Sequence, residues 1–173
     1  VTENVWDIGL IGAEPTRAEK IAFTAAYVEI EATYLVPEGS PLNTIEDVDA
    51  EGVRIAVSGR SAYDLYLSRS LKHAELHRAQ GLPGALELFM AEKMDALAGL
   101  RPALTGDLDK VPGGRILDGQ FTAVQQAVGT ARTKPEAAAY LSDVVEDAKA
   151  SGLIARLIEK HKVVGRLSVA GPA

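Results

Sequence analysis

The middle of the sequence alternates strand-like and helix-like segments, and this rhythm limits the possible folds more than any other feature. Short connections between such segments are typical of right-handed βαβ units around a parallel sheet. We therefore expect an α/β fold with largely parallel strands, whose loops and helix N-termini gather at the carboxyl edge of the sheet. The predicted strands and helices are, in chain order, 53–57, 61–72, 75–79, 83–93, 94–98 and 101–109.

Two extended runs with alternating polarity lie on either side of this block. Residues 28–36 and 121–129 both show the period of two that favours strands. Two strands that join separate material to a compact block are typical of two lobes connected by a hinge. We predict that 1–30 and 120–173 form lobe one, and that 31–119 form lobe two.

The outer parts of the chain carry further elements. A helix is predicted from Pro135, with Thr133 or Lys134 near its cap, because proline favours the first helical turn. One face of this helix has apolar residues spaced by three and four, namely Ala138, Leu141, Val145 and Ala148. The remaining predictions are a strand at 5–11, a turn-rich link before residue 28, a capped helical turn at 45–48, a helix at 152–161 and a surface coil from 163 to 173.

Composition excludes several classes of function. The net charge is −6 and no long run of Lys or Arg is present, which argues against a surface for nucleic acids. The absence of cysteine excludes disulfides, a thiol nucleophile and thiolate metal sites. No apolar run reaches the roughly 18 to 20 residues that a membrane helix needs.

Motifs for a nucleophile elbow, a phosphate loop or a dinucleotide fold are also missing, so we predict no enzyme and no cofactor. His73 and His77 are four residues apart, but a helix ending near Lys72 separates them, so no metal site is predicted.

The segment Gly59-Arg60-Ser61 lies between a predicted strand and a predicted helix. Backbone N–H groups and the positive end of the helix dipole can receive an anion there, and Arg60 adds a cation. Ser61 could equally serve only as the N-cap of the helix. Both interpretations stay open from the sequence.

Two further arginines follow predicted strands. Arg17 comes after the loop Gly12-Ala13-Glu14-Pro15-Thr16, where its planar guanidinium could grip a carboxylate with two hydrogen bonds. The alternative is a surface arginine paired with Glu14 or Glu19. Leu100 and Arg101 follow the strand at 94–98, and Arg101 could line a cleft or face solvent.

The stretch from Gly12 to Thr24 resembles the family 3 solute-binding proteins of ABC transporters, which have a Thr-rich loop followed by Pro-x-Arg and Phe-Ser. Four later segments resemble the family in the same order, and the similarity covers about 5 to 161. These segments are Ala26-Tyr27 with Tyr34-Leu35-Val36, Ile45 to Val48, Gly59-Arg60-Ser61, and Met94-Asp95-Ala96-Leu97.

The resemblance implies a type II periplasmic-binding-protein fold whose first lobe is incomplete here, with an export signal and the first half of that lobe preceding Val1. It also implies that Arg17 holds a ligand carboxylate and that Ser61 lines the second lobe. Gly12 and Glu14 replace the hydroxyl-bearing loop of the family, and Leu100 replaces the acid that would hold an amino group. A buried ammonium would then lack its charge partner, which puts an amino-acid ligand in question.

We therefore expect a periplasmic carrier that delivers a small carboxylate-bearing solute to a membrane permease, with Gly12, Glu14, Arg17, Gly59, Arg60, Ser61, Leu100 and Arg101 as the candidate ligand-binding residues. Two alternatives remain. A dehydratase of a cyclic acid could use Glu14 as general acid or base, and a sensory module could pass closure to a signalling partner. Apolar faces at 5–11 and 136–150 also predict self-association of the chain.

Overall fold

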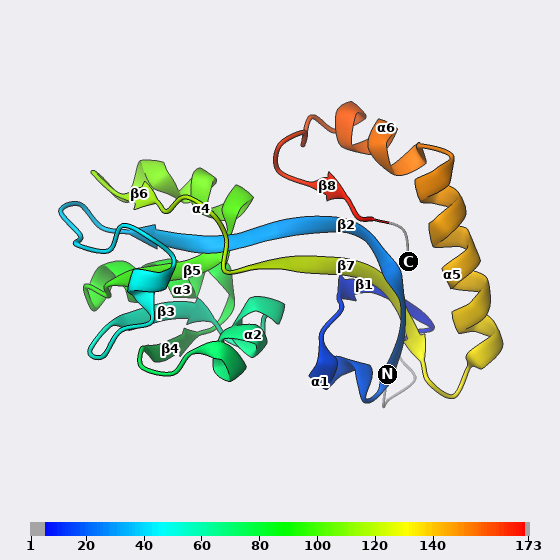
Figure 1. Ribbon diagram of the computed structural model, residues 1–173, viewed down its shortest axis with the longest axis horizontal. Helices are drawn as coiled ribbons and strands as arrows, with labels where there is room; N and C mark the ends of the chain where they lie inside the picture. The colour runs from blue at the N-terminus through cyan, green and yellow to red at the C-terminus, as the bar shows by residue number, and fades with distance from the viewer. Residues whose placement is uncertain (1–5, 172–173) are drawn as a thin grey trace. The chain divides into compact units, whose positions relative to one another are not determined.

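A computed structural model describes residues 6–171 and divides the chain into two compact units (Figure 1). Unit 1 comprises the residues up to Ile30 and from Val124, and unit 2 comprises Glu31–Ala123. Two strands, β2 (Ile21–Val36) and β7 (Thr122–Ala131), run from one unit into the other. The other elements of unit 1 are β1 (Ile8–Gly12), α1 (Pro15–Ala18), α5 (Pro135–Ala150), α6 (Leu153–Lys160) and β8 (Ser168–Val169).

Unit 2 is built on the strand-then-helix rhythm of the sequence. In chain order, its other elements are η1 (Glu46–Val48), β3 (Arg54–Ser58), α2 (Ala62–Ser70), β4 (Glu75–Ala79), α3 (Gly81–Ala91), β5 (Ala96–Leu100), α4 (Arg101–Asp107), η2 (Leu108–Lys110) and β6 (Arg115–Ile116). Strand β3 pairs in parallel with β4 and with β5. Helices α2, α3 and α4 follow β3, β4 and β5, so their N-termini gather at one edge of this parallel sheet (Figure 1).

The core of unit 2 lies between α3, α4 and the sheet. Its members are apolar residues that are almost completely shielded from solvent: Leu35, Ala56, Ala85, Leu86, Phe89, Met94, Leu97, Leu104 and Val111. Ile55 and Val57 are also buried within β3, as expected for β-branched residues in a central strand. This core fixes the position of the loops at the sheet edge.

Unit 1 contains antiparallel pairs. Strand β1 pairs with β7 from Ile8 opposite Thr130 to Gly12 opposite Gln126, and β8 pairs with β2 at Val28 and Glu29. A glycine is needed at Gly129, because an added Cβ would lie 2.5 Å from Ile21 Cγ2. The α/β class is confirmed, but the sheet is mixed rather than largely parallel, since β1, β6, β7 and β8 make antiparallel pairs.

Several predicted boundaries differ from the structure. Strand β2 begins at Ile21, not at residue 28, because the turn-rich link is limited to the short helix α1 and two residues after it. The predicted coil at 163–173 contains β8, whose partner β2 is remote in sequence. The strand predicted at 5–11 begins at Ile8, and Val5 lies outside the described residues.

Strand β5 also begins later than predicted. It starts at Ala96 instead of Met94, since the Met94 N–H donates to Phe89 O and so closes helix α3. Helix α5 begins at Pro135 as predicted, with Lys134 as its N-cap, and Val145 is its buried residue. The helical turn predicted at 45–48 corresponds to η1. Between residues 6 and 171, no helix is long and apolar enough to cross a membrane.

The turn between α2 and β4 is organised by one carboxylate. Asp49 accepts the backbone N–H groups of Lys72, His73 and Ala74 at distances of 2.8 to 3.1 Å. Burial alone would raise the pKa of Asp49, but the donors at Ala74, His73 and Lys72, aided by the charge of His73, outweigh it and lower the pKa. Asp49 therefore stabilises the fold while it is ionised.

We predict that Asp49→Asn lowers the free energy of unfolding at pH 7, because it weakens the charge-assisted bonds to the turn. The expected loss is only about 1 kcal/mol, because solvent screens such bonds near the surface. A carboxyl group whose pKa is lowered by folding stabilises the folded state at pH values above its unfolded pKa of about 3.9. This stabilisation is lost as the pH falls through the pKa of the folded state. The difference between the two proteins in thermal melts should therefore vanish in acid. Glu51→Gln at the same surface is the control. If the melting temperatures of Asp49→Asn and the unaltered protein differed by the same amount down to pH 2, the assignment would be contradicted.

Exposed apolar side chains concentrate on unit 1. Of eleven large apolar residues that are exposed in the described part, nine belong to unit 1: Trp6, Ile8, Leu10, Tyr140, Val144, Leu153, Leu157, Val164 and Val169. Ile8 and Leu10 lie on β1, which ends the sheet and pairs only with β7 among the described strands. Apolar edge strands tend to pair with other chains.

We predict that the 173-residue chain self-associates through the exposed edge of β1. Its mass in light scattering should therefore exceed 18.3 kDa and rise with concentration. Leu10→Lys should shift the chain towards monomer, because charges oppose edge pairing. Leu82→Lys, at an exposed position of unit 2, should leave the mass unchanged. A monomer at all concentrations would contradict this prediction.

Candidate functional site

The unit 1 candidates meet at the corner between β1 and α1. Gly12 ends β1, and Glu14 is the N-cap of α1, where its Oε2 accepts the Thr16 N–H at 2.9 Å. Pro15 occupies the first turn, as its fixed φ allows. Arg17 is the residue directly after Thr16, and it donates from Nη1 to Gly12 O at 2.8 Å. The sequence thus folds into a tight corner that holds Arg17 in a defined orientation.

Glu14 and Arg17 bring opposite charges into partly shielded surroundings. The Glu14 side chain is buried and Arg17 is half-buried. Desolvation lowers the pKa of Arg17, while the nearby Glu14 carboxylate acts in the opposite direction. Arg17 still carries its charge at neutral pH. A desolvated guanidinium gains more from a ligand carboxylate than one in water does, because the local dielectric constant is lower.

The unit 2 candidates Gly59, Arg60 and Ser61 form the loop between β3 and α2. Gly59 N–H donates to Ala79 O at 2.9 Å, and Ser61 N–H donates to Ser58 O at 3.3 Å. Ser61 is the N-cap of α2 and its Oγ accepts from the Asp64 N–H at 3.1 Å. The loop N–H groups of Gly59 and Ser61, which were expected to receive an anion, are thus bonded within the chain. The Ser61 side chain is half-buried and the Arg60 side chain is exposed.

Asp64 bonds to this loop, and the sequence analysis did not single it out. Its side chain is buried, and its Oδ2 accepts the Arg60 N–H at 2.7 Å. Its Oδ1 accepts from Arg78 Nε at 2.9 Å, so β4 and α2 are joined by an ion pair. The spacing of Ser61 and Asp64 matches the Ser-x-x-acid pattern of a capping box, which was a signal available in the sequence.

Tyr63 adds a buried hydroxyl beside the same loop. Burial raises the pKa of Tyr63, and the nearby hydroxyls of Ser61 and Ser58 oppose this shift. Within residues 6–171, the Tyr63 hydroxyl has no partner in hydrogen-bonding geometry.

The last two candidates lie where β5 passes into α4. Leu100 occupies the N-cap position of α4 and makes no side-chain cap bond. Arg101 donates from Nε to Glu31 at 2.6 Å, and from Nη2 to Gly119 O at 2.5 Å. Arg101 thus ties β2, α4 and the segment before β7 together. Since β3 and β5 are parallel neighbours, Leu100 lies at the same sheet edge as the Gly59–Ser61 loop.

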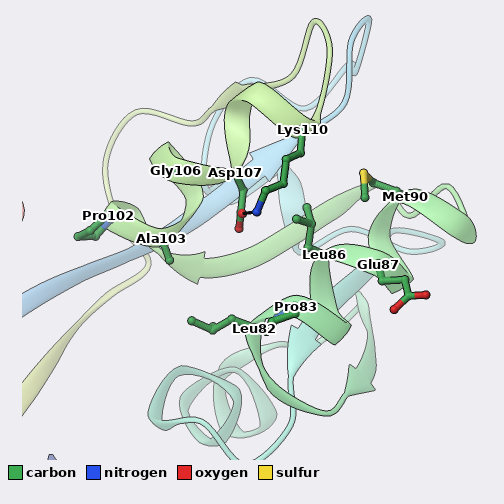
Figure 2. Close-up of a pocket in the computed structure, with 10 residues that line it drawn as sticks. All are labelled: Leu82, Pro83, Leu86, Glu87, Met90, Pro102, Ala103, Gly106, Asp107 and Lys110. Atoms are coloured by element: carbon green, nitrogen blue, oxygen red, sulfur yellow. Dashed lines mark hydrogen bonds and ion pairs between the residues drawn. The ribbon is translucent and has the colours of Figure 1, made fainter.

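One cavity of unit 2 is lined by none of the candidate residues. Figure 2 shows a cavity of about 360 Å³ between α3 and α4 of unit 2, lined by Leu82, Pro83, Leu86, Glu87, Met90, Pro102, Ala103, Gly106, Asp107 and Lys110. The Asp107–Lys110 ion pair at 2.8 Å crosses its rim. No group of three or more possible metal-ligating His, Asp or Glu residues occurs in the described part of the chain, and His77 lies in β4 while His73 lies in the preceding turn.

Comparison with solved structures shows which class of protein shares this fold. A mutant of ArgBP from T. maritima is 20% identical, with a TM-score of 0.73, and the match covers 92% of this chain and 70% of that chain. Cysteine-binding protein from Campylobacter jejuni is 15% identical, with a TM-score of 0.74, and the match covers 92% of this chain and 64% of that chain. The chain thus has the fold of amino-acid-binding proteins of ABC transporters, and it spans only part of their length.

A third neighbour is relevant to the enzyme alternative. The ancestral amino-acid-binding protein AncCDT-1, described as a precursor of cyclohexadienyl dehydratase, is 19% identical, with a TM-score of 0.73. The match covers 91% of this chain and 70% of that chain. No protein-family model matches the sequence, and no curated protein does. The structural neighbours confirm, at the level of the fold, the resemblance noted in the sequence.

Proposed function

We propose that this chain is part of the solute-binding component of an ABC transporter and that it captures a small carboxylate-bearing solute. The observation that carries the proposal is Arg17, a desolvated cation fixed by Gly12 O at the carboxyl end of a strand. A guanidinium in such surroundings suits a carboxylate, which it can bind through two hydrogen bonds. The shared fold with amino-acid-binding proteins supports the same function.

Glu14 suggests that the solute also carries an amino group. Leu100 cannot bind an ammonium group, but Glu14 places a carboxylate beside Arg17 in the same corner. Glu14 already accepts the Thr16 N–H and interacts with the charge of Arg17, and a carboxylate has about four acceptor positions for groups of this kind. Opposite charges in one partly buried corner match the two charges of an α-amino acid. We assign the candidate residues of unit 2, the Ser61 hydroxyl and Arg60, to ligand binding as well.

The experiment is a thermal-shift screen of the protein against the twenty amino acids and their deaminated acids, since a ligand that binds only the folded state raises the melting temperature. We expect at least one carboxylate to raise it, and the amino acid to exceed its deaminated counterpart. Arg17→Ala should weaken binding by roughly tenfold or more, because a charge-assisted contact is worth about 1.5 to 3 kcal/mol.

Arg132→Ala is the matched control for Arg17→Ala, because Arg132 also donates from Nη1 to a backbone carbonyl, that of Ala18, at 2.7 Å in unit 1. This control should bind like the unaltered protein. Unchanged affinity in Arg17→Ala would contradict the clamp. A screen in which no carboxylate raises the melting temperature would contradict the proposed function.

The partner and the location follow from the same proposal. A carrier of this kind works in the periplasm and delivers its solute to the permease of the transporter. Differential contacts in the open and closed forms would allow the ligand to shift the population towards closure. The similarity to a substrate-binding protein of an amino acid ABC transporter supports this context.

A dehydratase is the second candidate, and the observation that favours it is the burial of Glu14 to 5% exposure. A shielded carboxyl group can act as a general acid or base. If the protein is a dehydratase, it will convert a cyclic hydroxy acid, and Glu14→Gln will abolish turnover while the acid still binds. Chromatography of the reaction mixture measures this. Binding of the acid without any product from the unaltered protein would rule the dehydratase out.

A further inference from the structure

The loop between β3 and α2 has a conformation that its own sequence does not favour. Arg60 has a φ of 64°, in the left-handed region that a residue with a Cβ adopts at a cost. Glycine would take this conformation readily, yet the glycine of the loop is at position 59. Interactions outside Arg60 must therefore maintain this conformation, which determines where the Arg60 side chain and the Ser61 hydroxyl point.

Asp64 provides the required interaction. Its Oδ2 accepts the Arg60 N–H at 2.7 Å, so the turn directs this N–H towards the first turn of α2. The Asp64 side chain is only 4% exposed, so solvent competes little for the bond. Ser61 Oγ accepts the Asp64 N–H at 3.1 Å, which closes the turn from the other side.

Arg78 in turn holds Asp64. Arg78 Nε donates to Asp64 Oδ1 at 2.9 Å, and Arg78 Nη2 donates to Ser68 Oγ at 2.8 Å. Ser68 Oγ also donates to Asp64 O at 2.7 Å. A buried carboxylate requires this kind of compensation, because an unpaired buried charge is strongly unfavourable. The next residue of β4, Ala79, accepts the Gly59 N–H, so β4 is linked to both ends of the turn.

We infer that Asp64 and Arg78 are positioning residues of the ligand site: together they hold the Arg60–Ser61 turn in the one conformation that presents its side chains to the ligand. This inference rests on the proposed function and deepens it. It also has a consequence for the ligand, because the N-terminus of α2 already holds the anionic Asp64. The unit 2 loop therefore recognises the solute through the Ser61 hydroxyl and the Arg60 side chain rather than through its backbone N–H groups.

The opposite end of β3 offers a matched control. Asp95 Oδ2 accepts the Arg54 N–H at 2.8 Å and lies 3.6 Å from Arg54 Nε. This pair has the same chemistry as Asp64 with Arg60 and Arg78, in the same unit, but it is remote from the Arg60–Ser61 turn. Substitutions at the two pairs therefore separate an effect on the ligand site from a general effect on unit 2.

The first measurement needs no ligand. Amide hydrogen exchange, resolved by residue in NMR spectra of the ligand-free protein, should show the Arg60 N–H exchanging about tenfold faster or more in Asp64→Asn and in Arg78→Met. In Asp95→Asn and Arg54→Met the Arg60 N–H should exchange as in the unaltered protein. Equal exchange of the Arg60 N–H in all five proteins would overturn the inference.

The second measurement is the dissociation constant for each of the twenty amino acids, used singly as probes in calorimetry. We expect Asp64→Asn and Arg78→Met to weaken binding about tenfold, while Asp95→Asn and Arg54→Met stay within about twofold. The double variant should bind no more weakly than Asp64→Asn, because both residues act through the same turn. A merely structural role would lower the melting temperature in both pairs and leave the affinity unchanged in both, which would also overturn the inference.

Failure of the proposed function gives a different result. If no amino acid binds the unaltered protein, the amino-acid assignment fails, while the exchange measurement still decides whether Asp64 and Arg78 hold the turn. If the Arg60 N–H exchange changes as expected but the affinity does not, the turn is held as described and the claim that it presents the ligand groups is wrong.

Discussion

Both ends of β3 are held by an aspartate that accepts a backbone N–H, and the arrangement of unit 2 depends on these contacts. Asp95 binds the Arg54 N–H where the strand starts, and Asp64 binds the Arg60 N–H just after it ends. The parallel neighbours β4 and β5 are attached on either side of this strand. The candidate loop is therefore connected to a strand with four buried residues out of five, and ligand contacts made there would rest on a rigid support.

Charge is distributed differently around the candidate residues of unit 1 and around those of unit 2. In unit 1, Glu14 and Arg17 lie in one corner, and the desolvation of Arg17 makes a carboxylate partner favourable. In unit 2, the carboxylate of Asp64 already occupies the position at the helix N-terminus that an anionic ligand group would take. The candidate residues of the two units therefore differ in the ligand groups that they suit, and we assign a carboxylate to Arg17 of unit 1. The negative charge of the chain does not oppose this, because a local guanidinium decides the contact with a carboxylate.

The sequence was sufficient for the parts of the fold that depend on local periodicity. The three strand-helix pairs of unit 2, and helix α5 with Pro135 in its first turn, follow from apolar spacing and caps. Strand β8 could not be predicted in this way, since it pairs with a strand about 140 residues earlier in the chain. The role of Arg101 was hidden for the same reason, because its partner Glu31 is 70 residues away.

The candidate site was predictable to a similar extent. The N-cap role of Ser61 and the corner around Arg17 follow from local patterns, namely a hydroxyl before a helix and a Pro-x-Arg after a strand. Asp64 was signalled by its spacing from Ser61, but its dependence on Arg78 was not, because that ion pair exists only once β4 packs beside β3. The left-handed conformation of Arg60 had no sequence signal, since arginine is not a residue that favours it.

The central claim is that the protein binds a small carboxylate-bearing solute, and saturation-transfer NMR tests it most directly because this method detects even weak ligands. The protein would be mixed with amino acids and their deaminated acids in one sample, and saturation would be transferred from the protein to whatever binds. The account predicts transfer to at least one carboxylate. Transfer to none of these molecules would contradict the account.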